Sequence, residues 1–148
     1  MAKQAAEAPT FGLRLNGIKL SGQPYDYERA FAQAASDRRG NLMVMNSGVF
    51  FFDRQRLAAF ALAHQLASVF VFREFVTAGG LLSYGASITG MYRRATDFVG
   101  RIARGAKPAE LPVEQPTRFE LVINLKTAKA IGIELPTSLL LRADEVIE

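Results

Sequence analysis

The chain contains no cysteine and only one histidine, His64. The first absence excludes disulfide bonds, thiolate zinc sites and a cysteine nucleophile. A single histidine has no second imidazole with which to share a metal ion, so a structural role for His64 is favoured. The sequence also contains no G-x-S-x-G elbow, no Walker loop, no G-x-G-x-x-G and no H-E-x-x-H. The residues alone therefore give little support for catalysis.

Neither basic nor acidic residues strongly outnumber the other. The 18 basic and 14 acidic residues leave a net charge of +4 and are interspersed along the chain, which disfavours nucleic-acid binding. No stretch is long and apolar enough to span a bilayer, and the start MAKQAAEAPTFG lacks the apolar part of a secretory signal. Taken literally, these features predict a cytoplasmic chain. The 148 residues and 49% hydrophobic content suit one packed domain.

Three largely apolar runs predict buried strands at residues 42–45, 69–72 and 81–84. The first two are apolar at every position, which is typical of strands covered on both faces, as in a parallel sheet. A polar elbow and a helical segment follow each of these two runs within about thirty residues, the period of a strand–helix–strand unit. The sequence therefore predicts an α/β fold with a doubly wound, mostly parallel sheet.

Helical spacing of apolar residues predicts two amphipathic helices. The first contains Tyr27 and Phe31, and the second, at residues 88–102, has the cleanest apolar stripe in the chain. A further helix is expected to begin near Asp53 as its N-cap, and Asn124 is expected to cap a short one.

The remaining pattern predicts two strands and a terminal helical turn. Residues 11–20 fit a strand that is interrupted at Asn16 and Gly17. Residues 119–125 alternate as a half-covered or edge strand does. A last helical turn or two is expected from Pro136 onward.

Polar side chains close the three buried runs. Ligands of open α/β sheets bind beyond the carboxyl ends of the strands. Asn46 and Ser47 follow the first run, Arg73 and Glu74 follow the second, and Tyr84 ends the third. An arginine can hold a carboxylate through two hydrogen bonds, and a glutamate can meet an ammonium group. The same charged pair leaves open a small cytoplasmic α/β enzyme as an alternative.

Three consecutive phenylalanines, Phe50, Phe51 and Phe52, stand at the mouth of the predicted crevice. Packing in the core is the favoured interpretation, and stacking of a ring on an apolar or aromatic ligand is the alternative. An apolar wall with a few convergent polar groups suits a small amphipathic molecule.

Three long strings carry a resemblance to a known family. FREFVTAGGLLSYG, PAELPVEQPTRFELVINLKTAKAIGI and PTSLLLRADEVIE closely resemble the carboxyl-terminal half of substrate-binding proteins of ABC transporters, in the tryptophan/tyrosine-transporter-like family. The resemblance runs through essentially the whole chain and is looser before Asn41. It implies one lobe of a type 1 periplasmic binding fold, in a protein whose two lobes close on a small molecule and present it to a membrane permease.

The resemblance also implies what is bound and where. Members are associated with aromatic or branched amino acids and related molecules, and they are periplasmic or membrane-anchored. No catalytic residue, metal or cofactor is implied. Carried over by position, the residues that would bind the ligand are Asn46, Ser47, Phe50, Arg73, Glu74 and Tyr84.

The resemblance further predicts a fragment, because the family's signal sequence and first lobe have no counterpart here. Residues 1–10 are expected to form a loose arm or the tail of a truncated helix, and residues 11–85 the second-lobe domain. Residues 86–106 would carry a helix that returns to the first lobe. Residues 107–148 would form a proline-rich crossover, the last strand and terminal helices.

A missing first lobe has two expected consequences. One lobe leaves a ligand half solvated, so binding by this chain alone is expected to be weak or undetectable. The helix at residues 88–102 would expose the apolar stripe of Met91, Tyr92, Phe98, Val99 and Ile102. A second copy could cover this stripe, which predicts a homodimer or segment exchange. A self-associating domain without a ligand is a third alternative.

Overall fold

Five strands form a single sheet in the order β1-β2-β3-β4-β5. The computed structural model describes residues 8–36 and 41–148. The strands are β1 (Asn41–Met43), β2 (Ala67–Phe70), β3 (Leu82–Ala86), β4 (Phe119–Asn124) and β5 (Glu145–Ile147). β1, β2 and β3 run parallel, β4 is antiparallel to β3, and β5 is parallel to β4. The predicted α/β fold with a mostly parallel sheet is confirmed.

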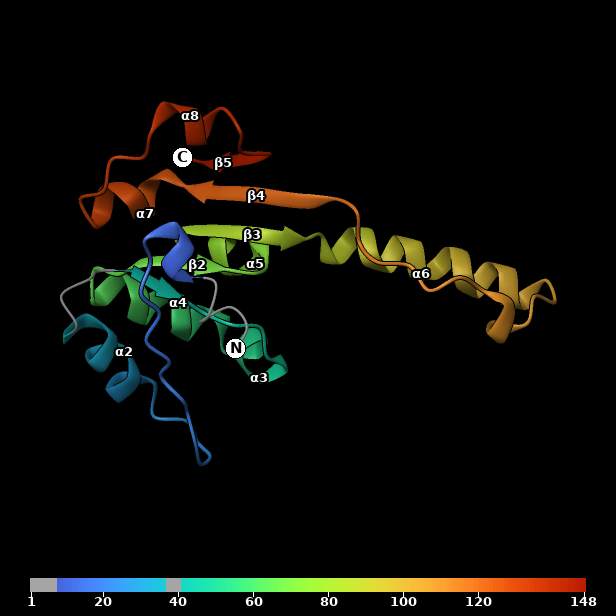
Figure 1. Ribbon diagram of the computed structural model, residues 1–148, viewed down its shortest axis with the longest axis horizontal. Coiled ribbons are helices and arrows are strands. Elements are labelled where there is room, and N and C mark those ends of the chain that lie inside the picture. Colours follow the sequence, from blue (N-terminus) through green and yellow to red (C-terminus); the bar gives the residue numbers. More distant parts are fainter. Residues whose placement is uncertain (1–7, 37–40) are drawn as a thin grey trace.

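Short helices connect the strands (Figure 1). The α-helices are α2 (Tyr27–Ser36), α3 (Gly48–Phe52), α4 (Arg54–Ala63), α5 (Arg73–Thr77), α6 (Ile88–Ala103), α7 (Leu125–Ala130) and α8 (Thr137–Leu140). Two 3-10 turns, η1 (Ala8–Phe11) and η2 (Pro108–Glu110), complete the set in the described residues. α4 links β1 to β2 and α5 links β2 to β3. Both helices lie on the same side of the sheet, because right-handed crossovers in one direction put their helices on one face.

The core lies between the sheet and this helical layer. α2 packs on α4 through Tyr27 and Phe31, which share one buried cluster with Leu57, Phe70 and Phe75. The amphipathic pattern of α2 is therefore satisfied inside the protein, as its sequence predicts.

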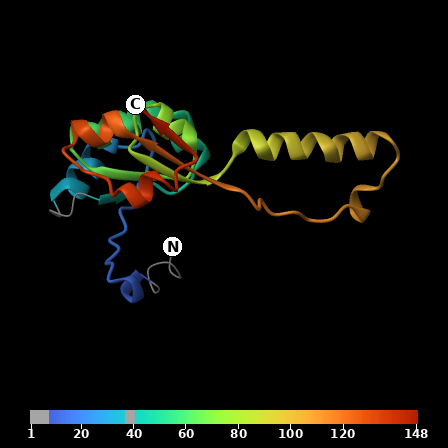
Figure 2. The same cartoon turned by 90° about the horizontal axis from the view of Figure 1, so that it is seen from above.

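α6 does not join this core. It leaves the body at the end of β3, and residues 104–118 return beside it to β4, so that together they form an arm that projects from the body (Figures 1 and 2). Arg94 of α6 donates hydrogen bonds to both carboxylate oxygens of Glu114 on the returning segment. These bonds hold the pKa of Glu114 below its usual value. The arm is thus internally tied without packing on the body.

The helix predictions agree well with the structure. The predicted stripe at residues 88–102 lies in α6, and α4 begins directly after Asp53. The Asp53 side chain makes no capping hydrogen bond and instead accepts one from the Tyr27 hydroxyl. Asn124 caps α7 by accepting a hydrogen bond from the backbone N–H of Thr127. The last predicted turn is α8. None of the helices in the described residues is long and apolar enough to cross a membrane.

The predicted strand at residues 11–20 is wrong. η1 occupies its start, and the rest is extended but belongs to no strand. β1, the strand at the sheet edge, is only three residues long, and apolar alternation makes a strand only where a neighbouring backbone supplies hydrogen bonds. The third predicted strand, at residues 81–84, is β3 at Leu82–Ala86. β4 lies between two neighbouring strands instead of at an edge. β5 is a strand that the sequence did not indicate.

Candidate functional site

The carboxyl ends of β1 and β2 bring two pairs of predicted residues to one edge of the sheet. Asn46 and Ser47 follow β1, and Arg73 and Glu74 form the first turn of α5 directly after β2. Neighbouring parallel strands end at the same edge, so these four residues share it. Ser47 is the N-cap of α3, but its hydroxyl accepts no capping hydrogen bond. Its side chain is therefore not committed to the helix end.

Arg73 is partly engaged by the protein itself. Its Nη2 donates to Glu145 Oε1 at 2.9 Å and to Oε2 at 2.6 Å. Both side chains are partly exposed, so this ion pair is worth little more than about 1 kcal/mol. A ligand carboxylate at Arg73 would share the guanidinium with Glu145 or displace it.

Glu74 has a buried carboxylate oxygen that lacks a partner. Within the described residues, Oε2 is shielded from solvent and accepts no hydrogen bond. Buried polar atoms are nearly always paired, and leaving one unpaired costs roughly 1–3 kcal/mol. Such an oxygen marks a place where a donor from outside this chain would be favourable.

Phe50 packs against other aromatic rings. Its ring meets those of Tyr25 and Tyr27 edge to face, with centroids 6.0 and 6.2 Å apart. The Tyr27 hydroxyl donates to Asp53 Oδ2 at 2.6 Å, and burial together with this carboxylate raises the pKa of Tyr27. Phe51 likewise packs on core rings, whereas Phe52 is 84% exposed. The packing interpretation therefore describes two of the three rings.

Tyr84 is not at the edge with the others. It lies within β3 opposite Leu121 of β4, whereas the neighbouring Ser83 is opposite Val122, which in turn is opposite Glu145. Because side chains alternate across a strand, Tyr84 points to one face of the sheet, and Glu145, the partner of Arg73, points to the other. Its ring is 60% exposed and stacks on Phe119. β3 ends at Ala86 and not at Tyr84, so Tyr84 lies inside the strand.

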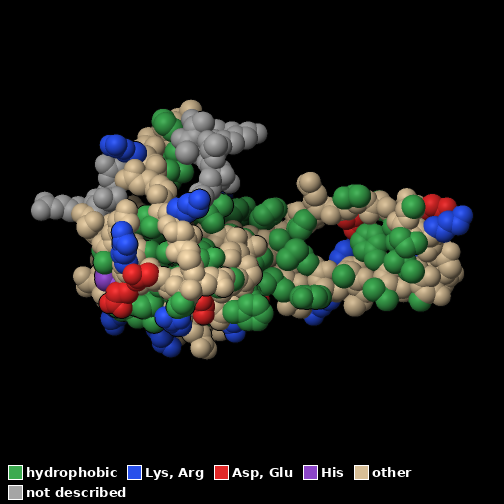
Figure 3. Space-filling model, turned by 90° about the horizontal axis from the view of Figure 1, so that it is seen from below, with side chains coloured by type: hydrophobic (Ala, Val, Ile, Leu, Met, Phe, Trp, Pro, Cys, Tyr) green, Lys and Arg blue, Asp and Glu red, His purple; other side chains and the backbone are tan. Residues whose placement is uncertain are grey.

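A hollow at the base of the arm was not predicted as part of the site. It has a volume of about 350 Å³ and is lined by Phe72, Ile88, Met91, Tyr92 and Ala95. Hydrophobic side chains gather at this junction of body and arm (Figure 3). Phe72 directly precedes Arg73 in the sequence, so one residue of the hollow's lining is next to the charged pair along the chain. The apolar residues that open the predicted helix at residues 88–102 are the sequence signal for this hollow. They are interpreted above only as a contact with the other lobe.

The site combines charged and apolar side chains. No group of three or more histidine, aspartate or glutamate side chains that could hold a metal ion occurs in the part of the chain that the structure describes. His64 lies at the end of α4, where its ring is near that of Phe31, with centroids 6.5 Å apart. The arrangement offers one cation, one carboxylate and an apolar surface.

A family model described as ABC transporter substrate binding protein matches residues 67–147. The chain belongs to this family, whose members are extracytoplasmic binding proteins and not enzymes. No curated protein sequence gives a significant match.

Solved structures show the same fold. An ABC domain in complex with L-Trp from Streptococcus pneumonia superposes with a TM-score of 0.85 at 21% identity, over 99% of this chain and 50% of that one. A conserved domain protein from Vibrio cholerae gives 0.83 at 21% identity, over 95% and 47%. The ligand-free, open form of a substrate-binding protein with adhesive properties from Clostridium difficile gives 0.65 at 15% identity, over 99% and 48%. The chain thus has the fold of one lobe and spans about half the length of these proteins.

Proposed function

We propose that this chain is the carboxyl-terminal lobe of a solute-binding component of an ABC importer, and that it binds a small amphipathic molecule such as an aromatic or branched amino acid. The observation that carries the proposal is the pair of Arg73 and Glu74 at the carboxyl end of β2, with the unpartnered Oε2 of Glu74. The residue before Arg73, Phe72, is part of the lining of the apolar hollow. Family membership supports solute binding in general.

The chemistry of the pair specifies a zwitterion. Glu74 Oε2 would accept a hydrogen bond from the ligand ammonium, and Arg73 would hold the carboxylate in place of Glu145. The wall formed by Phe72, Met91 and Tyr92 would contact an apolar side chain. Asn46 and Ser47 stand on the same edge and would supply further polar contacts. Phe50 and Tyr84 are proposed from their position in the sequence, and their rings contact other aromatic side chains.

The wider assembly is part of the proposal. A complementary lobe would close over the edge of the sheet and remove the ligand from water, which strengthens charged contacts. The division into residues 11–85 as the lobe domain and 86–106 as a helix directed to the other lobe fits the projecting arm in Figure 2. The complete protein would be extracytoplasmic, would deliver its ligand to a permease and would have no catalytic role. For this chain alone, a homodimer through α6 is the expected association.

The test is a titration of the 148-residue chain, labelled with ¹⁵N, with L-tryptophan, L-phenylalanine and L-leucine by NMR. Saturable shifts are expected at the amides of Asn46, Ser47, Arg73 and Glu74, with a Kd weaker than about 1 mM because half of the site is open to water. Glu74→Gln is expected to abolish the response to tryptophan. It should leave unchanged any response to indole-3-propionate, which lacks the ammonium group.

Glu134→Gln is the matched control, because Glu134 is exposed and remote in sequence from the charged pair. Shifts scattered over the surface, or an equal response of Glu74→Gln and wild type to tryptophan, would contradict the site. Micromolar affinity of the chain by calorimetry would contradict the half-site, because a single lobe would then suffice.

A further inference from the structure

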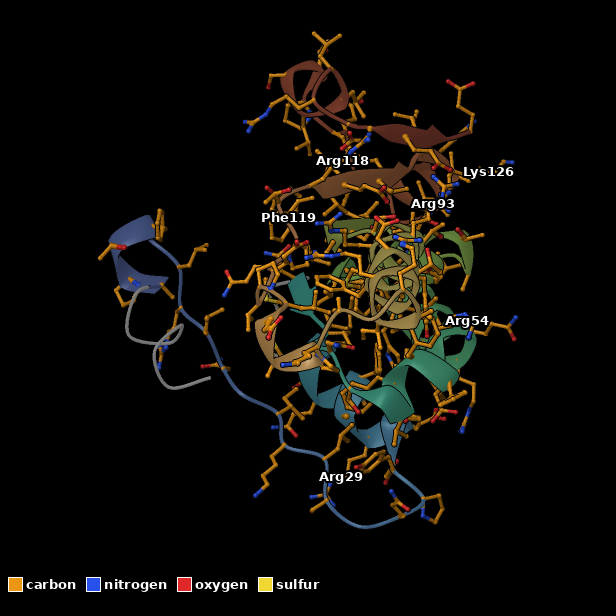
Figure 4. All side chains as sticks on the ribbon, turned by 90° about the vertical axis from the view of Figure 1, so that its right-hand side faces the viewer. Arg29, Arg54, Arg93, Arg118, Phe119 and Lys126 are labelled. Carbon is orange, nitrogen blue, oxygen red and sulfur yellow. The ribbon has the colours of Figure 1, made fainter. Side chains whose placement is uncertain are left out.

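The terminal strand β5 presents a carboxylate on the face of the sheet that α5 covers. β5 is the edge strand beyond β4, and both lie in the red-brown part of the chain at the top of Figure 4. The first residue of β5 lies in one cross-strand row that consists of Glu145, Val122 of β4, Ser83 of β3 and Phe70 of β2. Residues paired in this way point to the same face of a sheet, and the Phe70 ring packs on α5. Glu145 therefore points toward the helix that begins with Arg73.

The ion pair with Glu145 uses one nitrogen of the Arg73 guanidinium. Nη2 donates to both carboxylate oxygens of Glu145, whereas Nε and Nη1 have no acceptor among residues 8–36 and 41–148. Each side chain is 41% exposed, so a ligand can reach the pair. A guanidinium binds a carboxylate best through two adjacent nitrogens, and both such forks, Nε with Nη2 and Nη1 with Nη2, include Nη2. Glu145 therefore occupies the atom that any two-bonded ligand carboxylate needs.

Contacts other than this ion pair hold β5 in place. The strand pairs with β4 along its whole length. The backbone N–H of Asp144 donates to the carbonyl oxygen of Leu121 at 2.8 Å, and the N–H of Leu121 donates to Asp144 Oδ2 at 2.9 Å. An ion pair between two partly exposed side chains adds little to such bonds. The Arg73–Glu145 pair can therefore open without release of β5, and removal of the Glu145 charge should leave the fold intact.

We propose that Glu145 is a built-in competitor of the ligand carboxylate and thereby a specificity-determining residue of the site. A ligand carboxylate that binds Arg73 replaces one carboxylate by another, so its net gain in free energy is small. A ligand ammonium that binds Glu74 instead pairs an oxygen that has no partner in the described residues. The site thus selects its ligand mainly by the amine. Binding of a carboxylate also releases Glu145, which couples the ligand site to β5. This inference rests on the proposed function.

The test compares three indole compounds by NMR titration of ¹⁵N-labelled wild type and Glu145→Gln. L-tryptophan carries both charged groups, indole-3-propionate lacks the ammonium group and tryptamine lacks the carboxylate. Glu145→Gln is expected to tighten the Kd of tryptophan and of indole-3-propionate about two- to fivefold, the range of a surface ion pair, and to leave the Kd of tryptamine unchanged. In wild type, the two carboxylates should also shift the amides of Val146 and Ile147 in β5, and tryptamine should not shift them.

Glu148→Gln is the matched control, because it removes the same charge from an exposed side chain three residues later in the sequence. It should change none of the three Kd values, and circular dichroism checks that both variants fold. Unchanged or weaker binding of the carboxylates by Glu145→Gln would overturn the inference, because Glu145 would then not compete for Arg73. An equal gain for tryptamine would overturn it as well, because the effect would then not act through Arg73.

The wild-type comparison needs no variant. Equal shifts of the β5 amides with tryptamine and with tryptophan would overturn the release of Glu145 by the carboxylate. The proposed function would survive each of these results, because the compounds would still bind at the predicted edge. The absence of a saturable response to all three compounds, in wild type and in Glu145→Gln, would overturn the proposed function and this inference together.

Discussion

Replacing Gly85 by alanine is expected to leave the chain largely unfolded at room temperature. Gly85 is buried in β3, and a methyl group added to it would lie 2.0 Å from the carbonyl oxygen of Val71. The clashing atom is a backbone atom of the residue that follows β2, and Gly85 is held in β3, so no rotamer change can relieve the overlap. β2 and β3 would have to separate at their carboxyl ends. We estimate a loss of roughly 3 kcal/mol or more in the free energy of unfolding.

Urea denaturation followed by circular dichroism measures this loss. Gly17→Ala is the matched control, because a methyl group there meets no atom within 4 Å and Gly17 does not have a positive φ. Its free energy of unfolding should stay within about 0.5 kcal/mol of wild type. An equal denaturation midpoint for Gly85→Ala and wild type would mean that the two strand ends lie farther apart than described. The result matters for function because Val71 immediately precedes Phe72 and Arg73.

Local patterns account for the parts of the fold that the sequence predicts. Runs that are apolar at every position identify β1 and β2 to within two residues, although Met43 of β1 is exposed and β2 is fully buried only at every second residue. The stripe at residues 88–102 identifies α6 because helical periodicity is a local property. Asn124 identifies the start of α7, because its side-chain oxygen accepts a hydrogen bond from the Thr127 N–H, which has no backbone acceptor in the first turn of the helix.

Contacts between distant segments account for what the sequence does not predict. Residues 13–20 alternate as a strand does but have no adjacent edge to pair with in the described chain. Glu145 engages Arg73 across 72 positions of sequence, and no local pattern indicates such a pair. The face on which Tyr84 lies depends on the register of β3 against β4. β3 ends two residues later than predicted, so Tyr84 lies inside the strand and not at its end.

The sequence therefore predicts which edge of the sheet carries the candidate site, but not the partners of the individual side chains there. The rule that ligands meet the carboxyl ends of parallel strands selects Asn46, Ser47, Arg73 and Glu74, and the parallel pairing of β1 with β2 puts these four residues at one edge of the sheet. It cannot indicate that Arg73 already has a carboxylate partner or that Glu74 has a buried oxygen without one. These opposite states make Glu74 the more informative position for mutation.

Phe70→Ala is the second substitution expected to have a large effect. The Phe70 ring is 2% exposed and stacks on Phe75 with centroids 4.7 Å apart and planes inclined by 15°. Truncation removes a buried aromatic ring and leaves a cavity between β2 and α5, which typically costs about 3–5 kcal/mol. α5 is short, and Phe75 is one of its two buried residues. The loss should therefore loosen the helix that begins with Arg73 and Glu74.

The measurement pairs urea denaturation with hydrogen exchange of the α5 amides. Phe52→Ala removes the same ring from an 84% exposed position, so its midpoint and its exchange rates should match wild type. For Phe70→Ala, any fraction that stays folded is expected to exchange the α5 amides faster than the β4 amides, because the new cavity lies directly under α5. A destabilisation below about 1 kcal/mol would contradict the packing of this core. Equal exchange rates in α5 and β4 would show that the Phe70 ring stabilises the whole sheet and not α5 in particular. The position of Glu74 at the start of α5 would then not depend on the packing of Phe75 against Phe70.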